Sequence, residues 1–359
     1  MIIPFLVLAA TLAGAQTPAP AVASSSGAAA SAAPYSPEDN VSVSILKERF
    51  IEALDEPTRT KLLMRIAVTP PVSAEDVSAL FDLFSRFADP ELRKEVMASL
   101  ALIDPSSPQL DPMFISYLSQ PEPETQLFGI NGAFRLRSRD GLPLVRKIAE
   151  RKFKAADAAS ISLLSERNEW WTQYEALSAL SQWEGEKVLP LLRKKAKESS
   201  AIGQLLGRFF WVQTFPDLKS WAESRNDNVR EKAVEVAGAE IQPSEARATR
   251  AGMLKIIRDP KADEEVRHRL ALKVGASSTD SEVAALVAEH DQAKDPQLRL
   301  LLVAAIAYSR SPRAVPLLVR YARDTSDEIL SKGARAELVD LVGAEKAKAL
   351  LSEPKNVEK

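Results

Sequence analysis

The sequence contains no cysteine, only two histidines and only 13 glycines among its 359 residues. The absence of cysteine excludes disulfides, thiolate metal sites, cysteine nucleophiles and a lipid anchor on cysteine. Glycine-rich phosphate loops are not expected, and no G-x-S-x-G, P-loop or H-E-x-x-H motif occurs. Neither His268 nor His290 has a second histidine four residues along, so no helical metal pair forms, and both are expected at the surface. We therefore expect no metal, no cofactor and no enzymatic activity.

Charge of one sign is also missing, since 47 Lys and Arg face 49 Asp and Glu and leave a net charge of −2. Proteins that bind nucleic acid usually carry a strong basic excess, so nucleic acid is not an expected partner. Strand-like alternation is scarce, whereas Ala, Leu, Glu, Lys and Arg, which favour helices, are abundant. The composition thus predicts an all-α protein.

The longest apolar run lies at the N-terminus, from Ile2 to Ala15, and is too short to span a bilayer. It ends in Ala13-Gly14-Ala15 before Gln16, a cleavage pattern typical of export signals. No Lys or Arg precedes the run, and a buried N-terminal helix is the alternative interpretation. Residues 16–37 are nearly all Ala, Pro, Ser and Thr, which predicts a disordered linker. With residues 1–15 removed, the protein is expected in the periplasm or outside the cell, without a transmembrane segment.

From residue 41 onward, apolar residues recur at the spacing of amphipathic helices. Helices are predicted at 41–54 and 57–68, within an N-terminal pair at 38–70. From 71 to 342 the pattern repeats as a first helix, a short polar turn and a second helix, and 343–359 closes the chain with a helix and a tail. Successive anchors of the second helices lie 27 to 43 residues apart, a period typical of helical solenoids. These anchors are Leu92, Leu127, Trp170, Ile202, Val229, Val266, Leu298 and Ile329.

The turns carry a common chemistry. An Asp or Asn in the turn is expected to cap the second helix by accepting a bond from a free N–H group. Pro90 and Pro296 fall near the first helical position, where a missing N–H costs nothing. Small residues allow neighbouring helices to approach closely, among them Ala98, Ala176, Ala271 and Ala305.

These turns resemble those of HEAT repeats, in particular the short bacterial kind whose second helices begin with an Asp-x-x-Val-Arg turn. The resemblance covers about residues 74–342 and implies a right-handed α-α superhelix, HEAT- or armadillo-like, of about eight or nine helix pairs. It also implies that the second helices line a concave face, and that 38–70 and 344–351 are terminal caps. By the same resemblance, acidic residues and arginines of the turns form ladders between repeats: Asp89, Arg93, Asp227, Arg230, Asp263, Arg267, Asp295 and Arg299.

All five tryptophans lie between 170 and 221. Aromatic side chains supply much of the binding energy at protein interfaces, which makes this region a candidate recognition patch. The alternative is that bulky side chains fill uneven gaps between irregular repeats. The candidates for partner binding are Trp170, Trp171, Tyr174, Phe210 and Trp211.

Basic residues gather in two runs. The first contains Arg135, Arg137 and Arg139, and the second contains Arg193, Lys194, Lys195 and Lys197. Both runs suit an acidic partner or an anionic envelope ligand, or they form the solvated outer face of first helices.

The resulting prediction is a non-enzymatic scaffold of the cell envelope that binds a protein or peptide on its concave face. A binding module for a glycan or another anionic ligand is the alternative, and it needs exposed Trp rings on one face. A HEAT-like enzyme of unrecognised type is the third. The di-iron enzymes of this fold need several His-Glu pairs, and the chain has no His-Glu dipeptide. The partner and the oligomeric state stay open.

Overall fold

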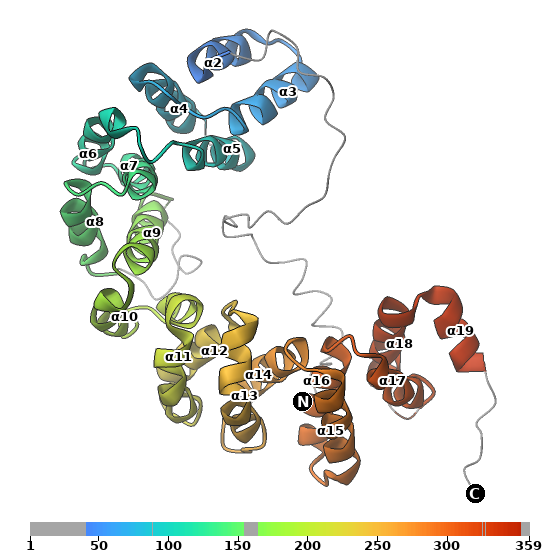
Figure 1. Ribbon diagram of the computed structural model, residues 1–359. Helices are drawn as coiled ribbons and strands as arrows, with labels where there is room; N and C mark the ends of the chain where they lie inside the picture. Colours follow the sequence, from blue (N-terminus) through green and yellow to red (C-terminus); the bar gives the residue numbers. More distant parts are fainter. Residues whose placement is uncertain (1–40, 88, 154–163, 325, 327, 353–359) are drawn as a thin grey trace, which may run out of the picture. The chain divides into compact units, whose positions relative to one another are not determined.

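The computed structural model describes residues 41–87, 89–153, 164–324, 326 and 328–352 (Figure 1). Every regular element in these ranges is helical, which confirms the all-α prediction. The predicted export signal at 1–15, the linker at 16–37 and the tail after 352 lie outside the described residues. The chain divides into two compact units between Leu205 and Leu206, called here the N-terminal and the C-terminal unit.

The N-terminal unit consists of short helices that follow one another closely. They are α2 (Val43–Glu52), α3 (Glu56–Ala67), α4 (Ala74–Arg86), α5 (Pro90–Ala101), the 3-10 turn η2 (Pro108–Leu110), α6 (Asp111–Leu118), α7 (Pro123–Leu136), α8 (Gly141–Ala149), α9 (Leu164–Glu184), η3 (Gly185–Val188) and α10 (Leu189–Lys195). The helices predicted at 41–54 and 57–68 are α2 and α3, and each predicted end lies within two residues of the observed one.

Within this unit the helices form two layers (Figure 1). The first helices α2, α4, α6 and α8 lie in one layer, and the second helices α3, α5, α7 and α9 lie in the other. Each first helix contacts the second helix that follows it, and each second helix contacts the next. The core between the layers is aliphatic and aromatic, with Leu46, Leu83, Val96, Phe128 and Leu177 buried.

Helix α11 (Ile202–Ala222) contains the boundary between the units and is two helices joined at a kink. The kink lies at Phe210, whose φ of −140° and ψ of 37° are not helical. A second helix therefore runs directly into the next first helix, without a connecting loop. This explains why the step between the anchors Ile202 and Val229 is the shortest in the sequence.

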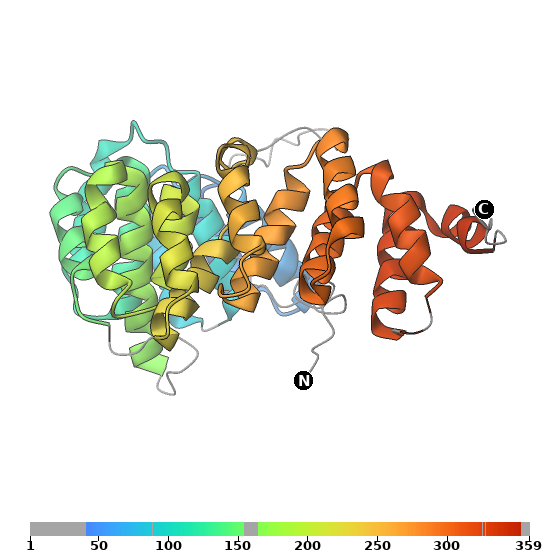
Figure 2. The ribbon, with the colours of Figure 1, turned by 90° about the horizontal axis from the view of Figure 1, so that it is seen from below.

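The C-terminal unit continues with α12 (Asp227–Gly238), α13 (Pro243–Ile257), α14 (Glu264–Ala276), α15 (Asp280–Gln292), α16 (Pro296–Tyr308), the turn η4 (Pro312–Ala314), α17 (Val315–Ala322), α18 (Glu328–Val342) and α19 (Ala344–Ser352). Here too each first helix packs on the second helix that follows it, in the pairs α13 with α14, α15 with α16, and α17 with α18. Successive second helices also contact each other, α12 with α14 and α14 with α16. In Figure 2 the orange and red helices, α15 to α18, run up and down beside one another.

The polar turns cap the second helices, as the sequence predicts. Asp89 accepts from the Glu91 N–H at 2.8 Å, and Asp263 and Asp295 make the same contact at the start of α14 and α16. In α12 the cap is Asn226, which accepts from the Val229 N–H. Each such cap stabilises its helix by roughly 1 kcal/mol.

Close helix packing depends on glycine as well as on the alanines. A Cβ on Gly275 of α14 would collide with the carbonyl oxygen of Ala305 on α16, and a Cβ on Gly132 of α7 would collide with the Phe114 ring. At Gly275 the missing side chain lets the backbones of α14 and α16 approach each other directly, and at Gly132 it makes room for the Phe114 ring.

The expectation that both histidines lie at the surface is wrong. His268 on α14 and His290 on α15 are buried, with 3% and 0% of their surface exposed. The charged neighbours of His268 in the sequence suggested a polar position, but α14 is covered by helices on several sides. His290 bonds the Tyr321 hydroxyl across to α17 at 2.7 Å. Burial lowers the pKa of both rings below the ordinary 6.5.

The buried histidines predict a loss of stability in mild acid. The pKa values of His268 and His290 in the folded protein lie below 6.5, so as the pH falls these two rings are protonated first in the unfolded chain. Their contribution to stability is therefore fully present above about pH 6.5. It is lost as the pH falls through the folded pKa values. Each unit of difference corresponds to about 1.4 kcal/mol. Urea unfolding at pH 7.5, 6 and 5 should show a fall in the free energy of unfolding that is smaller in a His268→Gln/His290→Gln variant. An equal fall in both proteins would contradict this origin.

Candidate functional site

The second-helix layer of the N-terminal unit exposes a narrow stripe along α9. The stripe consists of Trp171, Glu175, Ser178 and Gln182, spaced so that they share one side of the helix. The residues on the other sides of this part of α9 are mostly buried, since the helix packs on α7 and α8. Tyr174 is half-buried at the margin of the stripe. We call the set of Trp171, Glu175, Ser178 and Gln182 the α9 stripe.

An aromatic cluster supports the N-terminal end of the α9 stripe. Trp171 is 43% exposed, whereas Trp170 beside it is 4% exposed. The Trp170 ring stacks on Tyr174 with 5.3 Å between centroids, and it meets Trp171 edge-on at 5.0 Å. Phe153, four residues after the end of α8, packs against Trp170 with 5.6 Å between ring centroids. The exposed Trp171 ring is thus held in place by a buried aromatic base.

The other predicted aromatic candidates are not at a surface. Phe210 and Trp211 lie in the C-terminal unit with 3% and 0% exposed, and the Trp211 indole N–H donates to the Thr249 hydroxyl at 2.8 Å. Trp183 and Trp221 are half-buried. The sequence could not separate these roles, because adjacent residues point about 100° apart on a helix and the pattern does not show which of these directions other helices cover.

A polar cluster lies one turn before Trp171. The Glu124 carboxylate of α7 accepts from both terminal nitrogens of Arg93 on α5, each at 3.3 Å, and from the Asn168 amide of α9 at 2.7 Å. The Thr172 hydroxyl donates to the carbonyl of Pro123 at 2.8 Å. Three successive second helices are therefore linked beside the exposed Trp ring.

One arginine of the first predicted basic run, Arg137, reaches the other end of the stripe. Arg137 ends α7 in the left-handed conformation, with φ of 55°, and its guanidinium donates to the Gln182 carbonyl at 3.5 Å. The same guanidinium lies over the Phe134 ring, 5.1 Å from its centroid. Arg135 donates from Nε to the Ile103 carbonyl at 2.8 Å, and Arg139 is exposed in the following turn. Of the first predicted basic run, Arg137 therefore contacts α9, Arg135 contacts the segment after α5, and Arg139 follows Arg137 in the exposed turn.

The buried polar atoms of the described residues that have no hydrogen-bond partner include the indole nitrogen of Trp170 and the amide oxygen of Gln173 on α9. Such groups are uncommon in folded proteins, because each costs about 1–3 kcal/mol. Both lie on the stretch of α9 that carries Trp171, and other such atoms lie outside it, among them the Thr214 hydroxyl.

The second predicted basic run does not form one surface. Lys195 is 1% exposed, and its ammonium group donates to the Arg151 carbonyl and to Glu198. The Glu198 carboxylate also accepts from the Phe153 N–H at 3.1 Å. Lys195 therefore holds the end of α8 against α10, a role that a run of basic residues in the sequence does not reveal.

The arginines of the turns make two kinds of contact. Arg93, Arg230 and Arg267 each donate to a backbone carbonyl at the end of the preceding helix, at 2.8 to 3.0 Å. Each also reaches forward, to Glu124, Asp263 and Gln297 respectively, at the start of the next second helix. Asp227, by contrast, is exposed and pairs with Arg230, and Arg299 is exposed.

The contact with the carbonyl at the end of the preceding helix has a signal in the sequence, which is an arginine four residues after the capping residue. It also occurs in the first helix pair, where Asp55 caps α3 and Arg59 donates to the Ala53 carbonyl at 3.0 Å. The repeated turns predicted from the sequence do not include this copy. The arginine satisfies carbonyl groups that a helix end leaves without partners.

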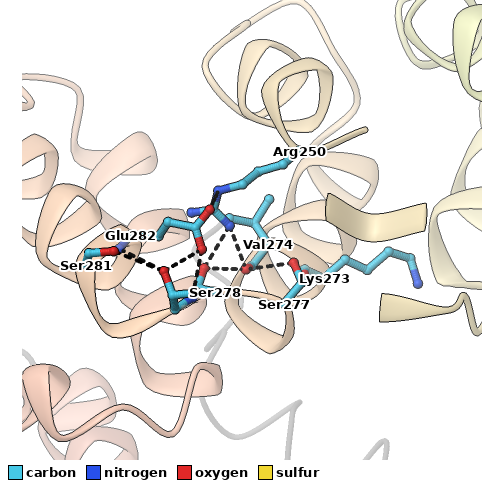
Figure 3. A network of polar contacts seen from close by, with 8 residues as sticks. Arg250, Lys273, Val274, Ser277, Ser278, Ser281 and Glu282 are labelled. Carbon is cyan, nitrogen blue, oxygen red and sulfur yellow. Dashed lines mark hydrogen bonds and ion pairs between the residues drawn. The ribbon is translucent and has the colours of Figure 1, made fainter. Parts of the chain in front are cut away.

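Figure 3 shows a polar network in the C-terminal unit. Arg250 of α13 donates to the Val274 carbonyl at 3.1 Å and to the Ser278 hydroxyl at 2.8 Å, and pairs with Glu282 of α15. Lys273 points away from the network toward the Ala239 carbonyl, and burial lowers its pKa to about 8. The network joins α13 to the junction of α14 and α15, which is a structural role.

The described residues include no group of three or more His, Asp or Glu side chains placed to hold a metal ion. No described helix combines the length and the apolar character needed to cross a membrane.

No family model matches the sequence, and a search of the curated proteins found no match. The resemblance to HEAT repeats therefore stands on the repeated turns, and its family remains a prediction.

The turn arginines predict a sharp difference between two equivalent positions. Arg267→Ala removes a side chain that is 1% exposed, leaves the Ile257 carbonyl and Gln297 without their donor, and opens a cavity. We expect a loss of about 2–4 kcal/mol in the free energy of unfolding. The matched control Arg299→Ala, at the exposed position of the next turn, should change it by less than about 0.5 kcal/mol. Equal effects in urea unfolding would disprove the buried role of Arg267.

Proposed function

We propose that this protein is a non-enzymatic scaffold that binds a protein or peptide along its second-helix layer. In this proposal the helix pairs form a right-handed HEAT-like superhelix of eight or nine pairs, and the second helices line its concave face. Stacked pairs offer extended surfaces built from equivalent positions, which suit the binding of an extended chain.

The observation that carries the proposal is the exposed Trp171 ring on the α9 stripe. The ring is 43% exposed yet held by the buried Trp170 and by Tyr174. A rigid aromatic side chain binds a partner at little cost in conformational entropy. Covering its exposed part, roughly 100 Å², would contribute about 2.5 kcal/mol at 25 cal/mol per Å². Trp171 thus has the character of an interface hot spot.

The glycan alternative receives less support. It calls for several exposed Trp rings on one face, and Trp171 is the most exposed of the five tryptophans, all of which the structure describes.

The test of the scaffold uses peptide-display selection on the full mature chain. The wild type should enrich peptides whose binding weakens about 10- to 100-fold in Trp171→Ala, the loss expected from about 2.5 kcal/mol with incomplete burial. The matched control Tyr308→Ala removes an aromatic side chain of similar exposure, 49%, from α16 and should leave binding unchanged. Both variants must keep the wild-type melting temperature. Peptides that bind wild type and Trp171→Ala equally well would refute the site.

The envelope location in this proposal comes from the apolar run at 2–15 and the small residues before Gln16. Expression in a bacterial host should yield an exported chain whose N-terminus, measured by mass spectrometry, is Gln16. A chain that keeps residues 1–15 and stays in the cytoplasm would exclude export.

A further inference from the structure

We propose that the α9 stripe selects an extended peptide that places acidic side chains about four to six residues away from an apolar or aromatic anchor. This inference rests on the proposed function and specifies the chemical class of its partner. The anchor covers Trp171, and the acidic residues meet Arg137 and Arg139.

The spacing follows from the geometry of α9. Trp171 and Gln182 are eleven residues apart on the same side of the helix, which places them about 16 Å apart along its axis. The Arg137 guanidinium is fixed to the Gln182 carbonyl and so marks the far end of the stripe. An extended peptide advances about 3.3–3.6 Å per residue, and about five residues cover this distance.

At the arginine end of the stripe, the Arg137 guanidinium is already oriented to bind a carboxylate. The Arg137 guanidinium is oriented by the Phe134 ring and by the Gln182 carbonyl, and it retains further N–H groups for a ligand. Phe134 is itself steadied by an edge-on contact with Trp183 at 5.9 Å. A planar guanidinium held in this way forms paired bonds with a carboxylate at a small entropic cost.

The acidic residues near Arg135, Arg137 and Arg139 do not neutralise all three. Glu184 is already paired with Arg146. Hydrogen bonds from Ser106, and to a smaller degree the charge of Arg135, lower the pKa of Asp104, so this carboxylate lies within electrostatic reach of Arg135. Asp140 is exposed in the turn that follows Arg139. Arg137 and Arg139 are therefore the main cations offered to a partner.

The opposite end of the stripe carries a carboxylate, Glu175, one helical turn from Trp171. The nearby Glu124 carboxylate is already paired with Arg93. Ser178 in the middle is small and leaves room for a backbone. An acidic residue next to the anchor would be repelled, whereas the same residue five positions away would be attracted. Binding to the stripe thus depends on the charge of the peptide and on the distance between that charge and the anchor.

The test uses display libraries in which a fixed Phe is followed by a segment of Gly and Ser, with a single Asp or Asn placed one to eight residues from the Phe on either side. Selection on the full mature chain at low salt should enrich Asp over Asn at least tenfold at four to six residues, and less at one or two. Added salt should reduce this preference.

The variant Arg137→Gln/Arg139→Gln should lower the preference for Asp to about one, while the matched control Lys147→Gln, on the first-helix layer, should retain it. Binding that needs Trp171 but is indifferent to Asp or its position would overturn this inference and leave the peptide scaffold intact. Selection of no peptide, with retention on a sulfated polysaccharide, would overturn both and favour an anionic glycan.

Discussion

The structure depends on one constraint: a pair of short amphipathic helices cannot bury its own apolar side chains. In the described residues each pair completes its core only against the next pair, through contacts such as those of α5 with α7 and α14 with α16. Glycine at 275 and small residues such as Ala305 bring the backbones of α14 and α16 together at one such junction. Every other feature, including the polar turns and the exposed stripe, is arranged around this repeated burial.

The arginines of the turns act on the same junctions. Each of Arg93, Arg230 and Arg267 meets a carbonyl group of its own pair and a side chain of the next. A single side chain thereby closes one helix end and fixes the spacing to the following repeat. Where the environment is dry, as around Arg267, the cation loses hydration and its pKa falls, so its hydrogen bonds carry more of the local stability.

The candidate site is a consequence of crowding on α9. With α7 and α8 packed around it, the helix buries most of its circumference and leaves only a narrow stripe for solvent. A tryptophan on that stripe exposes a large apolar area, and the buried Trp170 beneath it keeps the ring from collapsing onto its own helix. The two ends of the stripe differ in charge, with the Glu175 carboxylate one turn from Trp171 and the Arg137 guanidinium beside Gln182.

The sequence by itself determined the helical class, the alternation of helices and turns, and the caps of the second helices. These depend on local spacing and on side chains that bond their own backbone, as Asp89 does. Only the tertiary structure decided which of two adjacent aromatic residues is buried, that both histidines lie in the core, and that Lys195 is enclosed. Burial is fixed by which helices pack against a given side, and α9 and α14 are covered on several sides. A sequence pattern records the period of a helix and not the number of its neighbours.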